Sequence, residues 1–295
     1  MEARIYSVGD DDADVDDAYY DDTLEGAQRP AHQKHQKRRL PQCLIIGVRK
    51  GGTRALLEFL NLHPNIAAEK KEMHFFDDEV NYNRGLEFYR KRMPYSYEDQ
   101  VTLEKTPAYF VEEVVPGRVS AMNSSIKLIL ILRDPVERAI SDYMQIYTTR
   151  HERGKTHETF ENLAFDAMTG DVNKSYKAIR RSIYHRHMER WLEHFPLHQF
   201  HFVSAENLVQ NPVEELRKVE DFLQIDHRLT QDHFYFNQTR GFYCMHLQHR
   251  QKCLAPSKGR AHIPIDQDVI YKLREFFRPH NQEMYELVGM NFGWP

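Results

Sequence analysis

The chain has 295 residues, of which 41% are hydrophobic and 12% aromatic, and its formal net charge is −4. This is the composition of an ordinary globular protein. No run of 18 apolar residues occurs, which excludes a membrane-spanning helix in the chain as written, and the polar N-terminus is not a signal peptide. We therefore expect either a cytosolic protein or one whose targeting segment is absent from this chain.

The negative charge is concentrated at the N-terminus. Residues 1–40 contain ten acidic and six basic residues and show no apolar periodicity, so we predict a disordered acidic tail or stem there. The folded domain is expected at residues 41–295. This remaining part has 34 acidic and 34 basic residues and is neutral, which argues against a nucleic-acid partner. Any anion site must then be a local cluster of basic residues.

Short apolar runs alternate with helical patterns along the folded part. Apolar runs predict strands at 43–48, 126–132 and 199–204. Helices are predicted directly after 43–48, after Asp134 as N-cap with Pro135 at the first position, and at 175–194 and 211–223. This order predicts an α/β protein with a central parallel sheet covered on both faces, and the length allows one large domain or two small ones. Residues 228–265 lack a clear period, and we interpret them as loops.

The chain contains three cysteines. Cys244 and Cys253 lie nine residues apart in a loop-like stretch, where a disulfide would close a short loop; three reduced cysteines in a cytosolic enzyme are the equally weighted alternative. Cys43 lies in an apolar strand and is expected to be a buried thiol. Acceptor triplets for glycosylation at Asn123, Asn173 and Asn237 favour the secretory pathway and a glycoprotein.

A glycine-rich turn, GVRKGGTRALLEFL, follows the first strand and opens a helix. Glycines let backbone N–H groups approach phosphate oxygens, and the helix N-terminus adds positive potential. The turn departs from the Walker A pattern, because Lys50 precedes Gly51-Gly52 and Thr53 precedes Arg54. The second strand ends in Arg133 where a Walker B strand would offer an acid. We therefore predict a phosphate loop for a donor that needs no metal.

Six segments carry a resemblance to a known family: GVRKGGTRALLE, EMHFFD, EKTPAYF, ILRDPVERAISDY, FYFNQTRGFYC and SKGRAH, in this order over residues 42–295. The chain resembles the heparan sulfate glucosamine 3-O-sulfotransferases, with the type 1 and type 5 isoforms most similar. The resemblance implies a single α/β domain with a P-loop-kinase-like sulfotransferase fold, and an enzyme of the Golgi lumen. It also implies that 3'-phosphoadenosine 5'-phosphosulfate (PAPS) is the donor and that adenosine 3',5'-bisphosphate is the product.

The resemblance further implies which residues bind the donor. The 5'-phosphosulfate would be held by Lys50, Gly51, Gly52, Thr53 and Arg54, with Lys50 stabilising charge on the bridging oxygen as the S–O bond breaks. Arg133 and Ser141 match the family's ligands for the 3'-phosphate. The segment expected to close over the nucleotide comprises Tyr243, Lys258, Gly259, Arg260, Ala261 and His262.

A sugar hydroxyl is a poor nucleophile at neutral pH, so a base must take its proton as it attacks. By the resemblance, Glu72 is that base, His74 and Asp77 are its neighbours, and Lys105 contacts the sulfuryl group and the acceptor. His74 is the rival base. The expected contacts with a heparan sulfate or heparin chain are Arg49, Arg54, Lys105, Gln145, Lys258 and Arg260.

Two further groups of residues are interpreted as having no functional role. Lys174, Lys177, Arg180 and Arg181 are interpreted as a solvated helix face, with an extension of the acceptor groove as the alternative. The histidines of residues 185–201 fit no familiar zinc spacing and are interpreted as surface or packing residues, so no metal site is predicted. They are His185, His187, His194, His198 and His201.

Two other functions compete with a sulfotransferase that works as a monomer. A nucleotide kinase with the same loop would need magnesium and a Walker B acid, for which the sequence offers no good candidate. A non-catalytic glycosaminoglycan-binding protein on the same fold is disfavoured by the presence of Glu72, Lys50 and Lys105. Another carbohydrate sulfotransferase remains an alternative for the substrate.

Overall fold

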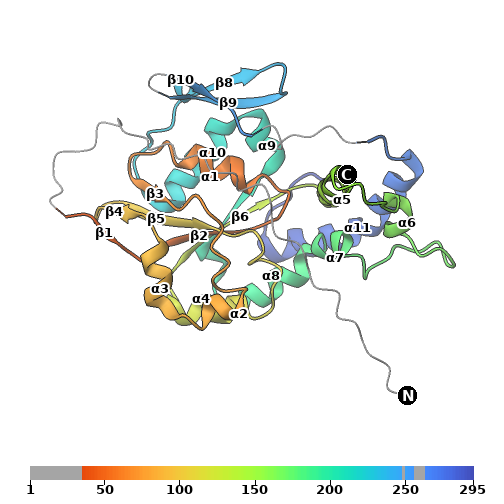
Figure 1. Cartoon of the computed structure of the whole chain (residues 1–295), viewed down its shortest axis with the longest axis horizontal. Coiled ribbons are helices and arrows are strands. Elements are labelled where there is room, and N and C mark those ends of the chain that lie inside the picture. The colour runs from red at the N-terminus through yellow and green to blue at the C-terminus, as the bar shows by residue number, and fades with distance from the viewer. Residues whose placement is uncertain (1–34, 248–249, 256–262) are drawn as a thin grey trace.

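A computed structural model describes residues 35–247, 250–255 and 263–295, and its centre is a five-stranded sheet (Figure 1). The strand order is β3-β5-β2-β6-β7, and every neighbouring pair is parallel. The strands are β3 (Ile66–Ala68), β5 (Val101–Lys105), β2 (Cys43–Gly47), β6 (Lys127–Leu132) and β7 (Phe200–Ser204). The predicted α/β domain with a central parallel sheet is confirmed.

Alternate residues of the central strands supply two separate cores. Leu44 and Ile46 of β2 point to one face, which is covered by helices that include α3 (Gly85–Arg92), α4 (Val115–Met122) and α8 (Tyr184–Leu192). Cys43 and Ile45 point to the other face, covered by α1 (Thr53–Leu60), α9 (Ala205–Gln210) and α10 (Pro212–Leu223). Strands buried on both faces read as continuous apolar runs, which is why 43–48 and 126–132 were recognisable in the sequence.

A third apolar cluster joins helices beyond the sheet edge. It is formed by residues of α5 (Pro135–Glu152), α6 (Phe160–Ala164), α7 (Lys177–Arg181) and α11 (Gln267–Val288). The shortest helix, α2 (Glu79–Tyr82), precedes α3, and two 3-10 turns occur at Leu197–Gln199 and Gln231–His233. Among the described residues, no helix combines the length and apolar character needed to cross a bilayer.

The single helix predicted at 175–194 is wrong, because the chain forms α7 and α8 with a break at Ser182 and Ile183. Ser182 is buried, accepts a hydrogen bond from Arg138 Nε at 2.7 Å and donates one to the carbonyl of Pro135 at 2.9 Å. These tertiary contacts determine where the helix breaks. They join residues that are distant in the sequence, so no local sequence pattern predicts the break.

Two small antiparallel sheets were not predicted. In the first, β1 (Lys37–Arg38) pairs with β4 (Tyr95–Ser96), so ordered structure begins inside the range 1–40 that we assigned to the tail. In the second, β8 (Phe234–Asn237), β9 (Phe242–Leu247) and β10 (Arg250–Lys252) form a meander, so the interpretation of 228–265 as loops is wrong in part. Both sheets are short, and although Phe234 and Met245 of the second sheet pack into the core, most residues of the two sheets are at least partly exposed, which leaves a weak apolar pattern.

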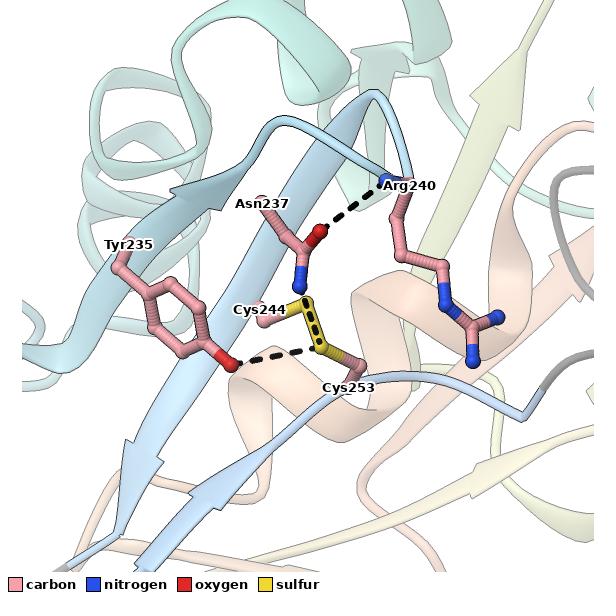
Figure 2. The surroundings of a disulfide bond; sticks show 5 residues. All are labelled: Tyr235, Asn237, Arg240, Cys244 and Cys253. Carbon is pink, nitrogen blue, oxygen red and sulfur yellow. Dashed lines mark hydrogen bonds between the residues drawn. A yellow bond between two sulfur atoms is a disulfide. The ribbon is translucent and has the colours of Figure 1, made fainter.

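Cys244 on β9 and Cys253 after β10 form a disulfide, the pairing that their spacing favoured (Figure 2). The Cys253 sulfur also lies 3.4 Å from the hydroxyl of Tyr235 and 3.7 Å from Nδ2 of Asn237. Cys43 is a buried free thiol, as predicted, and burial raises its pKa far above the usual value.

Candidate active site

The phosphate loop connects the carboxyl end of β2 to the first turn of α1. A Cβ at Gly51 would approach the carbonyl oxygen of Ile131 to 2.9 Å, so only glycine fits there. Gly52 and Lys50 adopt left-handed conformations with φ of 100° and 68°. Left-handed residues in such a loop let consecutive N–H groups converge on one anion, so the loop has the backbone of a phosphate site.

Side chains from later in the chain hold this loop. Lys50 Nζ donates to Gln145 Oε1 of α5 at 2.9 Å. Arg133, at the end of β6, reaches the carbonyl of Lys50 at 3.5 Å and Glu137 Oε2 at 3.4 Å. The guanidinium of Arg54 donates to the carbonyl of Lys70 at 2.7 Å, which links α1 to the segment that carries Glu72. The structure thus brings Lys50, Arg54, Arg133 and Gln145 together around one loop.

Three arginines surround the carboxylate of Asp142, which is 1% exposed; we call this group the arginine cluster. Arg49 Nε lies 3.1 Å from Asp142 Oδ1, while Arg138 and Arg181 lie 2.9 and 3.5 Å from Oδ2. Although burial opposes ionisation, the three guanidiniums hold the pKa of Asp142 far below its usual value. Arg181 therefore belongs to the surroundings of the phosphate loop and is not merely part of a solvated helix face.

A second chain of charges begins at the end of β5; we call it the Glu72 relay. Lys105 is 2% exposed and donates to Glu72 Oε1. His74 Nε2 lies 3.6 Å from Glu72 Oε2, and His74 Nδ1 lies 2.7 Å from Asp77 Oδ2. Ile45 of β2 pairs with Lys105 in the sheet, so the relay and the phosphate loop follow adjacent parallel strands.

The contacts within the Glu72 relay lower the pKa of Glu72 and raise the pKa of His74. Burial alone would raise the pKa of Glu72, but the neighbouring His74 and Lys105 outweigh it and lower this pKa to about 2. Hydrogen bonding to Asp77, and then to Glu72, raises the pKa of His74 to about 10. At neutral pH the glutamate is therefore ionised and the histidine is protonated.

Buried side chains fix the segment that carries the relay. Thr106 Oγ1 accepts hydrogen bonds from the backbone N–H groups of Met73 at 3.1 Å and His74 at 3.4 Å. The hydroxyl of Tyr109 accepts from Phe75 N at 3.1 Å. Glu104 accepts from Tyr89 at 3.1 Å and from Thr106, and burial raises its pKa to about 7. These contacts hold the backbone beside Glu72 in a fixed position.

A cavity of about 190 Å³ opens beside Glu72. Its lining mixes cationic, aromatic and amide side chains, a combination suited to a charged sugar. The lining residues are Lys71, Glu72, Met73, Phe75, Asn81, Phe88, Tyr89 and Arg92.

Comparison with known proteins identifies the family. Residues 40–287 match the sulfotransferase domain family. Heparan sulfate glucosamine 3-O-sulfotransferase 5 of Mus musculus is 51% identical over 270 residues, which cover 91% of this chain and 78% of the relative. The Homo sapiens protein of the same name is 53% identical over 257 residues, which cover 87% and 74%. The chain belongs to the heparan sulfate glucosamine 3-O-sulfotransferase family.

The fold agrees with this membership. The crystal structure of a sulfotransferase from Alicyclobacillus acidocaldarius superposes with a TM-score of 0.61 at 18% identity, covering 85% of this chain and 96% of the other. At this identity the likeness concerns the fold alone.

The remaining residues expected from the 3-O-sulfotransferase resemblance lie in three places. Ser141 is half-buried on α5, next to Asp142. Tyr243 lies on β9, where its ring packs edge-on against Phe236 at 5.4 Å. Five expected residues fall outside the described part of the chain, namely Lys258, Gly259, Arg260, Ala261 and His262. The roles of all these residues stay predictions.

Sequence reasoning missed the residues that support the site. Asp142, Glu104 and Thr106 contact functional side chains or their backbone but lie in apolar or helical stretches. Asp142 could have been found from its position. It is an acid on the buried face of α5, four residues after Arg138, and a buried charge without a partner is costly, so an ion pair with Arg138 was to be expected.

Proposed function

We propose that this enzyme transfers a sulfuryl group from PAPS to the 3-hydroxyl of a glucosamine residue in heparan sulfate. The observation that carries the proposal is that Lys105, at the end of β5, joins Glu72 beside the phosphate loop that follows the adjacent strand β2. Lys50, Gly51 and Gly52 belong to that loop. The names of the relatives point to the same acceptor.

Each group has one task in an in-line transfer. Glu72 accepts the proton of the attacking hydroxyl, whose oxygen forms the new bond to sulfur. The bond from sulfur to the bridging phosphate oxygen breaks, and Lys50 stabilises the charge that develops on that oxygen. Adenosine 3',5'-bisphosphate leaves with the electron pair, and no covalent enzyme intermediate forms.

The pKa values favour Glu72 over His74 as the base. His74, whose pKa is raised to about 10, holds its proton between two carboxylates and has no lone pair to offer at neutral pH. Glu72 is ionised but weakly basic while Lys105 and His74 contact it. Once Lys105 turns to the sulfuryl group, Glu72 loses one of its two cationic neighbours and becomes a stronger base. Lys105 thus couples donor binding to activation of the base.

Arg133 and Ser141 are proposed to bind the 3'-phosphate, and Tyr243 with residues 258–262 to close over the nucleotide. Arg49, Arg54, Gln145, Lys258 and Arg260 are proposed to contact the acceptor. The cations beside the Glu72 cavity, Lys71 and Arg92, extend the set that faces a sulfated chain.

The enzyme is proposed to act as a monomer in the Golgi lumen, without a nucleic-acid partner. The disulfide favours an oxidising compartment, and the neutral folded part does not suit a nucleic acid. The tail or stem expected at residues 1–40 lies, as far as residue 34, outside the described residues.

Donor binding is proposed to need no metal, because lysine and arginine side chains supply the charge at the loop. Calorimetry with adenosine 3',5'-bisphosphate should give the same affinity with and without EDTA. Lost binding in EDTA would overturn the metal-free proposal. Lys50→Ala should lose donor affinity and turnover together.

The decisive assay is incubation with radiolabelled PAPS and heparan sulfate, followed by disaccharide mapping. Label at a glucosamine 3-O position is the expected result. Label at another position would identify another glycosaminoglycan sulfotransferase, and absence of label with retained heparan sulfate binding would identify a non-catalytic binder.

A further inference from the structure

Helices α8 and α11 bring two imidazoles and a carboxylate together, outside the site described above. His185 of α8 contributes Nε2, which lies 3.1 Å from Nδ1 of His280 on α11. Glu283 follows His280 by three residues and therefore lies on the same face of α11. One ligand atom from each of these three residues lies within 4.8 Å of the others. We call this group the α8–α11 triad.

We propose that the α8–α11 triad binds a divalent transition metal of the zinc class and thereby fastens the C-terminal helix to α8. Two histidines and one glutamate, with a fourth position left to water, are an established ligand set for zinc. This inference does not depend on the proposed sulfuryl transfer.

The spacing of the two ring nitrogens fits a shared metal. Two imidazole nitrogens at about 2.0–2.1 Å from a tetrahedral metal are about 3.3 Å from each other. The 3.1 Å between His185 Nε2 and His280 Nδ1 is close to this value. The two rings are nearly parallel, with an interplanar angle of 13° and centroids 5.2 Å apart, so the two nitrogens face each other and each ring must rotate for both lone pairs to meet at one ion. The ion would replace the proton that these nitrogens share.

The other nitrogen of His185 also suits a metal ligand. His185 Nδ1 is buried and has no well-oriented hydrogen bond, although Glu283 Oε2 lies 2.9 Å away and Glu189 Oε1 3.6 Å away. Metal-bound histidines usually donate their second N–H to a carboxylate. When the exposed side chain of Glu283 turns to the metal, Glu189, one turn further along α8, can accept the Nδ1–H of His185.

Charged side chains of both signs surround the α8–α11 triad. Arg186 and Lys174 lie near His280, and their positive charges oppose a bound cation. Glu189 and Glu283 offset these two positive charges.

The test is calorimetric titration of the untagged full chain with Zn²⁺ after treatment with a chelator. We expect one site, with affinity reduced more than about 100-fold in His280→Gln and about 10–100-fold in Glu189→Gln. The control His198→Gln, at an exposed histidine outside the triad, should bind as the parent does. Co²⁺ in place of Zn²⁺ should give the absorption of a tetrahedral site in the parent but not in His280→Gln.

Several outcomes would overturn the inference. They are no binding of Zn²⁺ by the folded chain, equal affinity in His280→Gln, and loss of binding in His74→Gln instead, which would place the metal in the Glu72 relay. Circular dichroism of each variant establishes that it is folded. Binding of adenosine 3',5'-bisphosphate should persist in chelator throughout, so failure of the metal site and failure of the proposed function are distinguishable.

Discussion

The Glu72 relay and the arginine cluster both surround an acid with cations, yet they differ in how firmly the acid is held. Asp142 is 1% exposed and touches three guanidiniums, whereas Glu72 is 19% exposed and meets one lysine and one histidine. Arg138 is anchored further by Ser182 and by the carbonyl of Ala178. Glu72 instead borders a cavity.

The difference separates a structural charge from a reactive one. Both acids have a lowered pKa, so the shift alone does not mark a catalytic residue. What distinguishes Glu72 is a partly exposed carboxylate beside a cavity, and we propose that its lysine partner turns to the ligand. Asp142 has no such freedom, because its partners lie on α5, on α7 and in the phosphate loop, and all of these would have to move. Substitutions in the two groups should therefore affect different measurable quantities.

The largest effect is expected for Glu72→Gln. Glutamine keeps the shape of the side chain but cannot accept a proton, so turnover should fall by about 10²–10⁴. This corresponds to about 3–5 kcal/mol in the activation free energy. Affinity for adenosine 3',5'-bisphosphate, measured by calorimetry, should change little.

His74→Ala is the matched control for the rival base. It removes one of the two cations beside Glu72 but leaves the carboxylate, so it should retain more turnover than Glu72→Gln. An inactive His74→Ala together with near-normal turnover in Glu72→Gln would assign the base to the histidine.

Asp142→Asn should instead reduce stability. Asparagine leaves three arginines without their shared carboxylate, and breaking a buried ion pair costs about 3–5 kcal/mol. Urea unfolding measures this loss, with Asp171→Asn, at an exposed position, as the control. Equal midpoints for the two variants would show that the arginine cluster does not hold these helices together.

A smaller effect is expected for Arg181→Ala. Arg181 lies 3.5 Å from Asp142 and is 20% exposed, while Arg49 and Arg138 remain as closer partners. The loss of unfolding free energy should be about 1 kcal/mol or less. A loss as large as that of Asp142→Asn would mean that Arg181 dominates the cluster.

The sequence predicted those parts of the molecule that follow local rules. Apolar strands of the buried sheet, Asp134 as N-cap and the glycine loop were recognisable, and Asp134 does accept from the N–H groups of Val136 and Glu137. The break at Ser182 and the α8–α11 triad depend on residues distant in sequence, such as His185 and His280, which are 95 positions apart. Glu72 was found through the family resemblance, because a lone glutamate in a connection carries no chemical signal of its own.

The smallest expected effect concerns pH, and it sharpens the choice of base. The pH dependence of kcat/KM reports the pKa values of the free enzyme. With a pKa of about 2, Glu72 is ionised throughout pH 6–8, so it should contribute no slope in this range. A histidine base with a pKa of about 10 would instead raise kcat/KM about tenfold per pH unit, because its neutral fraction grows by that factor.

Glu104 provides the control for this profile, since burial raises its pKa to about 7 and it contacts the segment that carries Glu72. Its ionisation as pH rises through 7 adds a buried charge, which can produce a shallow inflexion of a few-fold at most. Glu104→Gln should remove that inflexion and leave a flat profile. Initial rates at PAPS concentrations well below KM measure both curves, because kcat/KM for PAPS then refers to the free enzyme. A slope that persists near one in Glu104→Gln would assign proton transfer to His74 and remove Glu72 from the base role.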